Sequence, residues 1–405
     1  MESVARELTE RCRSGQRGEA VREVCRLSRE TALQAKQRML QGVLDDAVNQ
    51  ALGAPRGPRP TAIAPWTCRK CGQRRGDQLR RNGHYRRQLV VVEGVLHLRM
   101  PQIVCVTCRK SVPVEHPLLL RRQRLWSDID QRVATTYLEG CSYRATKRLL
   151  ERDASTSIGL MTLWRRFQAV GAAEHRLPER LPAQYLGLDE LHMKVKGQKR
   201  WVLAVRAQDA EGGKHWVGSV IAENRLQITW EAALDELGVS RYRPAFGVIS
   251  DGDDAIEGAI ATTLPGVRRY RCTWHLKHNA AEWIKERYPT SDHKGQRKGL
   301  MAAVHGIVDA PDLRQRRESL AAIRPEFAWL ADRLERVLER IPPKTAEHPV
   351  RTNNLMERGF RECRRRTRPM DGFGSDKGMS NFLLLWMMKE NALSNGRDYL
   401  REILP

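Results

Sequence analysis

The chain has 405 residues, of which 41% are hydrophobic, and a formal net charge of +23 from 71 Lys and Arg against 48 Asp and Glu. This length is sufficient for roughly two to four domains with buried cores. Because no run of about 18 apolar residues occurs and the N-terminus is charged, we expect neither a membrane-spanning helix nor a signal peptide. The charge favours a phosphate-rich partner such as nucleic acid. A non-enzymatic basic protein, for example a ribosome-associated one, would have a similar balance.

The first fifty residues carry apolar side chains at helical spacing. They are Val4, Leu8, Cys12, Val21, Val24 and Leu27, followed by Leu33, Met39, Leu40, Val43 and Leu44. We expect a helical region over residues 1–55, with Cys12 and Cys25 in its core. The Pro- and Gly-rich segment 53–60 is typical of a linker.

Two Cys-x-x-Cys pairs follow the linker: Cys68 with Cys71, and Cys105 with Cys108. Four thiolates in two such pairs can hold one tetrahedral Zn²⁺ ion, and paired cysteines favour metal binding in a reducing compartment. Strand-like residues 88–100 lie between the pairs, so we predict a zinc ribbon with one structural Zn²⁺ over residues 61–122. The 33-residue gap (72–104) is longer than in the commonest four-cysteine patterns. Two redox-active pairs are the alternative, although no βαβ pattern surrounds either one.

Residues 126–172 have the pattern of three short helices, at 128–138, 143–151 and 160–167. Ser142 is a suitable N-cap for the second helix. In the third, Leu160, Leu163 and Phe167 would face a core. That leaves three residues outward for a DNA major groove: Thr162, Arg165 and Arg166. We predict a helix-turn-helix DNA-binding domain, with a basic helical spacer as the alternative.

After Pro182 the pattern changes to strands at 185–189, 200–206 and 215–221, then a helix near 226–237 and a strand at 245–250. Short turns join the first three strands, which predicts an antiparallel meander. This is the element order of an α/β RNase H-like fold. Asp189 ends the first strand and Asp251 follows the last, so both would lie at the rim of a sheet, where ligands of open α/β sheets bind.

Glu357 opens a helical, arginine-rich stretch and is the third acid of interest. Three carboxylates can hold two Mg²⁺ or Mn²⁺ ions, an arrangement that drives in-line phosphoryl transfer. Each acid alone could equally be a solvated residue at a sheet rim. Three arginines follow Glu357, and we expect them to bind DNA phosphates: Arg361 and Arg364, which share its helical face, and Arg365.

Other acids lie close to Asp189, Asp251 and Glu357 in the sequence, but we expect them to face away from the site or to cap a helix. Glu190 follows Asp189 in a strand and so points to the opposite face. Asp253 and Asp254 precede a helical pattern and are typical capping acids. Glu362 lies five residues after Glu357, which is about 140° around a helix.

Three segments around these acids resemble the DDE transposases of Mutator-like elements and their bacterial insertion-sequence relatives. They read ISDGDDAI (249–256), YRCTWH (270–275) and RTNNLMER (351–358). The resemblance extends over about 183–390. It implies a core that begins at 183–275, an all-helical insertion at 276–345 and a return to the core with C-terminal helices at 346–405. Cys272 and His275 would be the family's Cys-x-x-His signature and shape the active site, with packing alone as the alternative.

This resemblance implies a transposase that cleaves DNA at the ends of its element and transfers the freed 3′ ends to target DNA. Asp189, Asp251 and Glu357 would hold two Mg²⁺ (or Mn²⁺) ions, and no covalent protein–DNA intermediate would form. The partners would be double-stranded DNA, at terminal inverted repeats and at the target, and at least one further copy of the chain. We expect a bacterial cytoplasmic protein associated with the nucleoid and not with a membrane. Two alternatives are an RNase H-like nuclease or resolvase without strand transfer and a transposase-derived DNA-binding protein without activity.

Overall fold

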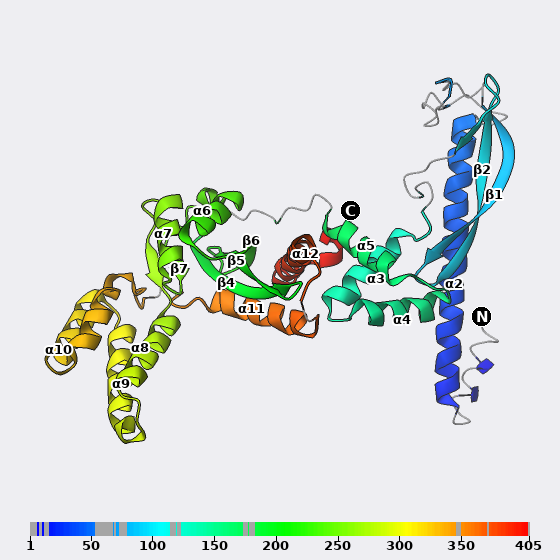
Figure 1. Ribbon diagram of the computed structural model, residues 1–405. Coiled ribbons are helices and arrows are strands. Elements are labelled where there is room, and N and C mark those ends of the chain that lie inside the picture. The colour runs from blue at the N-terminus through cyan, green and yellow to red at the C-terminus, as the bar shows by residue number, and fades with distance from the viewer. Residues whose placement is uncertain are drawn as a thin grey trace. The chain divides into compact units, whose positions relative to one another are not determined.

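The computed structural model divides into two compact units, Met1–Phe167 and Gln168–Pro405. It describes residues 6–7, 10–11, 16–52, 68, 70–72, 79–113, 119, 123–172, 177, 183–345, 350–370 and 372–403. Both units combine helices with a sheet (Figure 1), so the predicted mixed α/β architecture is confirmed. Within these ranges, no helix has the length and apolar character needed to cross a membrane.

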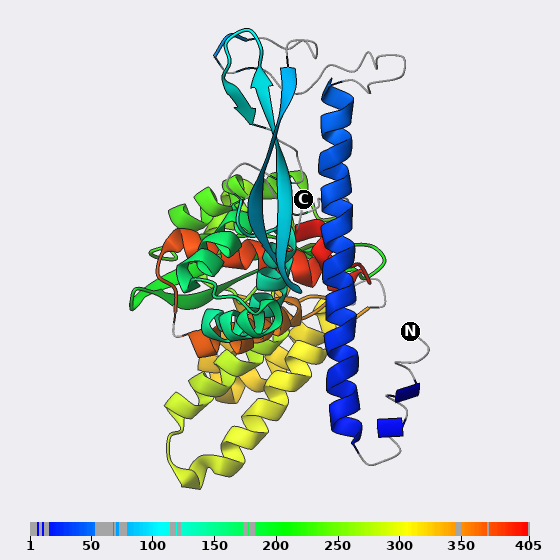
Figure 2. The same cartoon turned by 90° about the vertical axis from the view of Figure 1, so that its right-hand side faces the viewer.

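The first unit is built on a 36-residue helix, α2 (Arg17–Leu52), and an antiparallel hairpin of β1 (Leu79–Val91) and β2 (Gly94–Cys105). A short strand, β3 (Ser111–Pro113), pairs with the end of β2. Figure 2 shows α2 running alongside the hairpin. Apolar side chains from both elements form the core between them: Leu40, Leu44, Leu89, Leu96, Leu98 and Met100.

Two glutamines of α2 also bind the backbone of β2. Gln37 Nε2 donates to the carbonyl of His97 (2.7 Å) and Gln37 Oε1 accepts from its N–H (2.8 Å). One helical turn later, Gln41 makes the same two bonds with Arg99, at 3.2 and 2.9 Å. Each glutamine side chain therefore hydrogen-bonds to both the N–H and the C=O of one residue of β2, as a neighbouring strand would.

The N-terminal part of α2 departs from the prediction. Cys25 is exposed, and so are Val21 (53%), Val24 (50%) and Met39 (70%). Cys12 lies outside the described residues. Leu33 packs against Gly94 at the hairpin turn, so the helix before Leu33 extends beyond the hairpin that covers its apolar side. The prediction of Cys25 as a core residue was wrong, because helical periodicity in the sequence does not show how far along α2 the covering hairpin extends.

Three short helices complete the first unit: α3 (Ser127–Leu138), α4 (Tyr143–Ala154) and α5 (Leu160–Gly171), the last of which crosses the boundary between the units. The Ser142 hydroxyl accepts from the N–H of Ala145 and caps α4, as predicted. Leu163 and Phe167 are fully buried. The third helix is therefore oriented by its apolar residues in the expected way.

The second unit contains a five-stranded sheet in the order β6-β5-β4-β7-β8. Its strands are β4 (Tyr185–Val195), β5 (Gln198–Gln208), β6 (Lys214–Ala222), β7 (Gly247–Ser250) and β8 (Arg269–Arg271). The first three are antiparallel, whereas β7 runs parallel to β4 and β8 parallel to β7. The predicted meander followed by a parallel strand is confirmed.

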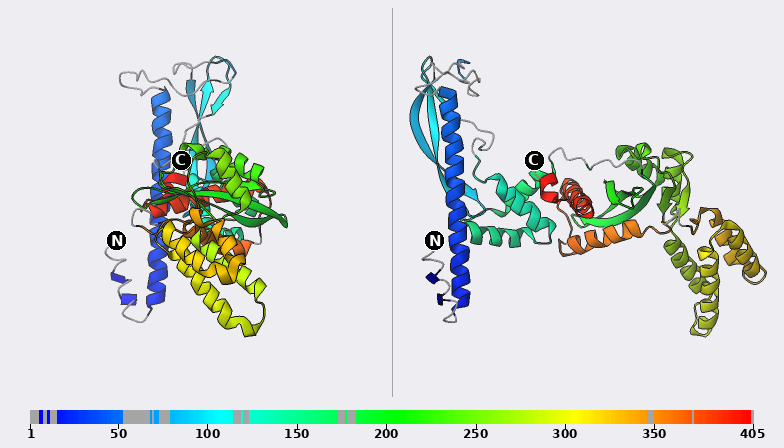
Figure 3. Two further views of the ribbon diagram at one scale, coloured as in Figure 1. Left: turned by 90° about the vertical axis from the view of Figure 1, so that its left-hand side faces the viewer. Right: turned by 180° about the vertical axis from the view of Figure 1, so that it is seen from behind.

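Helices cover both faces of this sheet (Figure 3). On one face, α6 (Gln227–Glu236) and α7 (Asp254–Thr263) pack on Leu186, Leu188 and Leu203. On the other, α11 (Asn354–Thr367) and α12 (Asp376–Ser394) pack on the sheet, and Trp216 of β6 contacts aromatic side chains of both helices. A short helix, α13 (Tyr399–Ile403), follows.

A helical segment separates β8 from α11. It comprises α8 (Thr273–Arg287), α9 (Lys294–Asp309) and α10 (Leu313–Glu335), with its own apolar core around Ile284, Val304 and Leu334. Short 3-10 helices punctuate the unit at Val239–Arg241, Ser291–His293, Leu338–Arg340 and Arg368–Met370. The segment leaves the sheet at Cys272 and returns to it at α11.

Candidate functional site

Asp189 and Asp251 lie side by side on neighbouring parallel strands. The last paired residues of β4 and β7 are Gly187 and Ile249, so each acid lies two residues beyond that pair. Asp251 directly follows β7, as predicted. Asp189 differs from the prediction, because β4 continues to Val195 with only β5 as its partner. Asp189 is thus held within a strand rather than at its end.

The sheet also brings Glu357 toward Asp189. Asn353 and Met356 approach Gly187 so closely that a Cβ there would lie 2.7 Å from Asn353 Oδ1 and 3.1 Å from Met356 Cγ. Gly187 therefore allows the first turn of α11 to rest on β4. Burial, and then the negative charges of Asp251, Glu190 and Glu357, hold the pKa of Asp189 well above its usual value. Asp251 and Glu357 are therefore both close enough to Asp189 for their charges to act on it.

A cavity of about 880 Å³ opens beside these acids. Asp189 and Glu357 line it, and Asp251 does not. Trp274, His275 and several basic residues of α11 and the following turn complete its lining: Arg361, Arg364, Arg365 and Arg368. The three arginines expected near Glu357, which are Arg361, Arg364 and Arg365, line the same cavity as that glutamate. Sequence reasoning missed Arg368, although its spacing of seven from Arg361 places it on the same side of a helix.

The remaining acids have partners of their own. Glu190 is ion-paired with Arg225, which precedes α6, but it also lines the cavity. Asp253 caps α7, since its Oδ1 accepts from the N–H of Ala255 at 3.0 Å, and Asp254 is in the first turn. Glu362 is ion-paired with Arg365 at 3.0 Å.

The acid cluster fits divalent cations by charge and by ligand type. Asp189 is held among like charges, and Oε1 of Glu357 is buried with no hydrogen-bond partner among the described residues. A cation would relieve both conditions. The carboxylate oxygens of Asp189, Asp251 and Glu357 do not all come within 4.8 Å of one another, however, in the part of the chain that the structure describes.

Cys272 and His275 lie directly beside Glu357. Cys272 is the buried N-cap of α8, and His275 is in its first turn, with Nε2 3.5 Å from Oε1 of Glu357. Burial raises the pKa of the Cys272 thiol and lowers that of His275, so both are held in their neutral forms. The alternative of a pair that serves packing alone does not account for this contact with Glu357.

Asn353 connects these groups, and sequence reasoning gave it no role. Its backbone N–H donates to Sγ of Cys272 (3.1 Å), and its Nδ2 donates to the carbonyl of Leu188 (2.9 Å). Its side chain is almost fully buried. An Asn next to a helix start is typical of a capping residue, so the sequence carries little signal for this longer-range contact.

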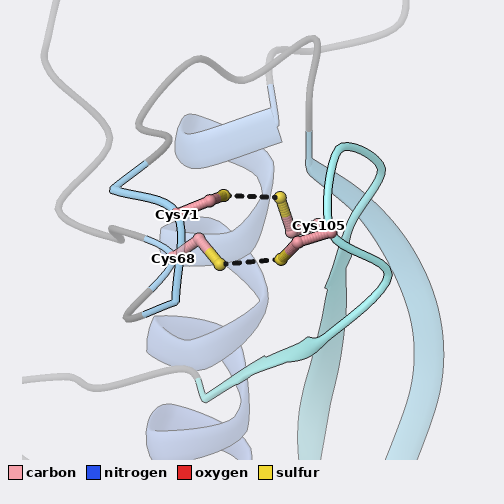
Figure 4. A group of neighbouring side chains, drawn as sticks. Cys68, Cys71 and Cys105 are labelled. Atoms are coloured by element: carbon pink, nitrogen blue, oxygen red, sulfur yellow. Dashed lines mark hydrogen bonds between the residues drawn. The ribbon is translucent and has the colours of Figure 1, made fainter.

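The four cysteines of the first unit form a second candidate metal centre (Figure 4). Their sulfurs lie within 4.8 Å of one another, with Cys68 3.4 Å from Cys108 and Cys71 3.6 Å from Cys105. Backbone N–H groups of Cys71 and Lys70 lower the pKa of Cys68 to about 6. This favours the thiolate form that Zn²⁺ requires. The residues therefore fit a tetrahedral Zn²⁺ ion.

The predicted DNA-facing residues of α5 differ in their surroundings. Thr162 and Arg165 are exposed, as expected. Arg166 is instead half-buried and ion-paired with Asp130, with a guanidinium N–H 2.7 Å from Oδ2. It also donates to the carbonyls of Leu125 and Trp126. The prediction that Arg166 faces outward was wrong, because it is ion-paired with a partly buried acid of α3, Asp130.

The sequence model of a family described as "Transposase, Mutator family" matches residues 16–392. The chain belongs to the Mutator family of transposases. The match includes both candidate metal centres. It places this Mutator-family chain among proteins that move DNA segments.

Curated relatives are named as transposases for insertion sequence elements. The chain is 25% identical over 348 residues to the transposase for insertion sequence element ISRM5 of Rhizobium meliloti, covering 81% of this chain and 80% of that protein. It is 26% identical to the transposase for IS406 of Burkholderia multivorans, covering 71% and 75%. It is also 26% identical to the transposase for IS1081 of Mycobacterium tuberculosis, covering 82% and 80%. The Mutator-family resemblance predicted from the sequence is confirmed.

Proposed function

We propose that this transposase cuts DNA at the ends of its element and joins the freed 3′ ends to target DNA, using Asp189, Asp251 and Glu357. The observation that carries the proposal is the meeting of these three acids at one edge of the sheet. The acids of β4 and β7 are in matched positions, and Gly187 admits the helix that bears Glu357. The negative charges of Asp251 and Glu357 both raise the pKa of Asp189.

The sheet order supports an RNase H-like core. Three antiparallel strands, a helix and then a parallel strand followed by Asp251 is the element order that the sequence pattern predicts for that fold, and β8 adds a second parallel strand. The helices α8 to α10 occupy the position of the all-helical insertion that the family resemblance implies.

Two Mg²⁺ or Mn²⁺ ions bound by the three acids would activate water and stabilise the leaving 3′ oxygen. The chain holds each ligand by a different means. Asp189 is fixed within β4, and Asp251 accepts a hydrogen bond from the N–H of Asp253 (2.9 Å). Glu357 is fixed by the packing of Met356 on Gly187. Because the three side chains are already positioned, little reorganisation would be required when the ions and DNA bind.

The arginines of α11 would bind the phosphates on either side of the cut. Arg361 and Arg364 line the same cavity as Glu357 and are exposed. A guanidinium can donate two hydrogen bonds to one phosphate, which orients the backbone as well as neutralising it. The positive charges of these arginines offset the repulsion between the DNA phosphates and the three acids.

Element recognition is assigned to the first unit. The four-cysteine site would be a zinc ribbon with one structural Zn²⁺, and α3 to α5 a helix-turn-helix that presents Thr162 and Arg165 to the major groove. Arg166 would instead support this unit from inside, through Asp130. The partners would be double-stranded DNA at the inverted repeats and at the target, bound by two or more copies of the chain.

The deciding experiment detects joined products. Purified protein is incubated with Mg²⁺, a labelled duplex that ends in the inverted repeat flanking the gene, and a supercoiled target plasmid. We expect the label to become covalently attached to the plasmid, and the Asp251→Asn variant to give no attachment. Cleavage of the duplex without attachment would favour the nuclease or resolvase alternative. Binding without cleavage would favour a non-enzymatic protein.

A further inference from the structure

The Cys272-x-x-His275 segment has the same two-residue spacing as the two cysteine pairs of the first unit. In all three segments, backbone N–H groups two and three residues after the first cysteine act to lower its pKa, although burial raises the pKa of Cys272 overall. A related local arrangement therefore occurs at the four-cysteine site and beside the catalytic acids.

A third ligand is supplied by another element. One ligand atom each of Cys272, His275 and Glu357 lies within 4.8 Å of the others. Oε1 of Glu357 is buried and has no hydrogen-bond partner within the described ranges, and Nε2 of His275 lies 3.5 Å from it. Buried polar atoms are rarely left in this state, and an ion is one of the ordinary explanations.

We infer that Cys272, His275 and Glu357 form a site for Zn²⁺ or a similar borderline-soft divalent ion, in addition to the four-cysteine centre. A thiolate and an imidazole favour zinc, whereas Mg²⁺ prefers oxygen ligands alone. Three protein ligands leave a fourth position open. His275 and Glu357 both line the cavity, so an ion held by them would be reachable from it.

This site has a consequence for activity that rests on the proposed function. Glu357 would be shared, since it serves the Mg²⁺ ions in catalysis and the softer ion when zinc is bound. Zinc at this site holds Glu357 against Cys272 and His275 and so removes a ligand from the catalytic ions. Zinc is therefore an inhibitor of magnesium-dependent cleavage.

The test compares zinc binding by full-length wild type with that of Cys272→Ala. Cys363→Ala is the matched control, since Cys363 is also a fully buried thiol of the second unit. We expect wild type and Cys363→Ala to bind one more zinc per chain than Cys272→Ala, and Co²⁺-substituted protein to lose part of its thiolate charge-transfer absorption in the Cys272 variant alone. Equal zinc content in folded wild type and Cys272→Ala would overturn the site.

Glu357→Gln provides a second measure if Cys272→Ala does not fold. It should weaken the additional zinc site by about tenfold or more, in the range seen when the surroundings of a metal ligand are altered; an unchanged affinity would overturn the site. In magnesium buffer, zinc sufficient to fill this site should slow wild-type cleavage, and a chelator should restore it. An unchanged rate would overturn the inhibition. Zinc counting requires no DNA, so the site and the proposed function can fail independently.

Discussion

The backbone N–H of Asn353 donates to Sγ of Cys272 at 3.1 Å and joins the starts of α11 and α8, beside two hydrogen bonds from Thr273 to the carbonyl of Arg351. The side chain of Asn353 at the same time donates to the carbonyl of Leu188, the residue before Asp189. One residue thus ties together the three segments that carry Asp189, Glu357 and the Cys-x-x-His pair. Its position explains why acids distant in the sequence meet.

Replacing Asn353 with alanine should reduce cleavage about 10- to 100-fold while leaving DNA affinity unchanged. The buried carbonyl of Leu188 would lose its donor, which costs about 1–2 kcal/mol, and the first turn of α11 would no longer be fixed to β4. Because this is a positioning role, the Mg²⁺ concentration that gives half-maximal cleavage should rise. Asn354→Ala, at the exposed neighbouring position, is the control. Equal Mg²⁺ dependence in both variants would contradict the role of Asn353.

Carboxamide substitutions should separate binding from chemistry. Asp189→Asn, Asp251→Asn and Glu357→Gln each keep the shape of the side chain but remove the charge that holds a hard cation. We expect each to abolish cleavage in a gel assay and to retain DNA binding in a gel-shift assay. Glu362→Gln, on the same helix but ion-paired with Arg365, should cleave normally. Activity near wild type in any of the three would remove that acid from the site.

The four-cysteine centre should be required for the first unit and not for the second. Cys68→Ser should lose one zinc per chain relative to wild type, because such sites couple metal binding to folding. Hydrogen exchange should then increase in β1 and β2 and remain low in β4 and β5. Cys141→Ser, at a cysteine outside both clusters, should retain its zinc. Full zinc content in Cys68→Ser would exclude Cys68 as a ligand.

Local patterns in the sequence predicted the helices, the strand directions and the caps, because each depends on neighbouring residues. Ser142 and Asp253 cap the helices that follow them, as their types suggest. Contacts between distant segments were not predictable in this way. The exposure of Cys25 depends on where the hairpin ends, at the turn beside Gly94, and the pairing of Arg166 depends on the partly buried Asp130. The continuation of β4 past Asp189 had a signal, the alternation of buried Leu191 and Met193 with exposed His192 and Lys194, but the charged residues concealed it.

The turn between α4 and α5 should lose stability in acid. Lys147, the N–H of Ile158 and the hydroxyl of Ser157 lower the pKa of Glu151 from 4.5 to about 2. A lowered carboxyl pKa contributes stability that is present above the unfolded value and is lost as pH falls from about 5 toward 2. Hydrogen exchange of residues 151–163 should therefore increase on acidification in wild type. Compared at each pH, Glu151→Gln should differ from wild type at pH 6 and converge with it near pH 2, whereas exposed Asp46→Asn should match wild type throughout.

Alanine substitutions of Arg166 and Arg165 should have different effects on stability, although the two residues are adjacent on α5. Arg166→Ala leaves Asp130 without its ion pair in a partly buried position, and should lower the free energy of unfolding of the first unit by on the order of 2 kcal/mol. Arg165→Ala removes an exposed side chain and should leave that free energy within about 0.5 kcal/mol of wild type. Thermal unfolding followed by hydrogen exchange in α3 distinguishes the two. Equal destabilisation by both would contradict the assignment of Arg166 to the interior.

Two sets of basic and polar residues should contribute differently to DNA binding, which as a whole should weaken steeply with salt because the chain carries +23. Neutralising Arg361, Arg364 and Arg365 should weaken binding and cleavage on every sequence about equally. It should also reduce the salt slope by about one for each DNA phosphate that the variant no longer neutralises.

Changing Thr162 and Arg165 should instead weaken binding to the element's own ends by about 1–3 kcal/mol for each base that is no longer recognised, with a smaller effect on random DNA. The measurement is the ratio of specific to non-specific affinity for each set at one fixed salt concentration. A ratio that is unchanged by the Thr162 and Arg165 substitutions would show that α5 does not read the DNA sequence. Recognition of the ends would then have to come from the four-cysteine hairpin or from α2, whose exposed N-terminal half is not covered by the hairpin core.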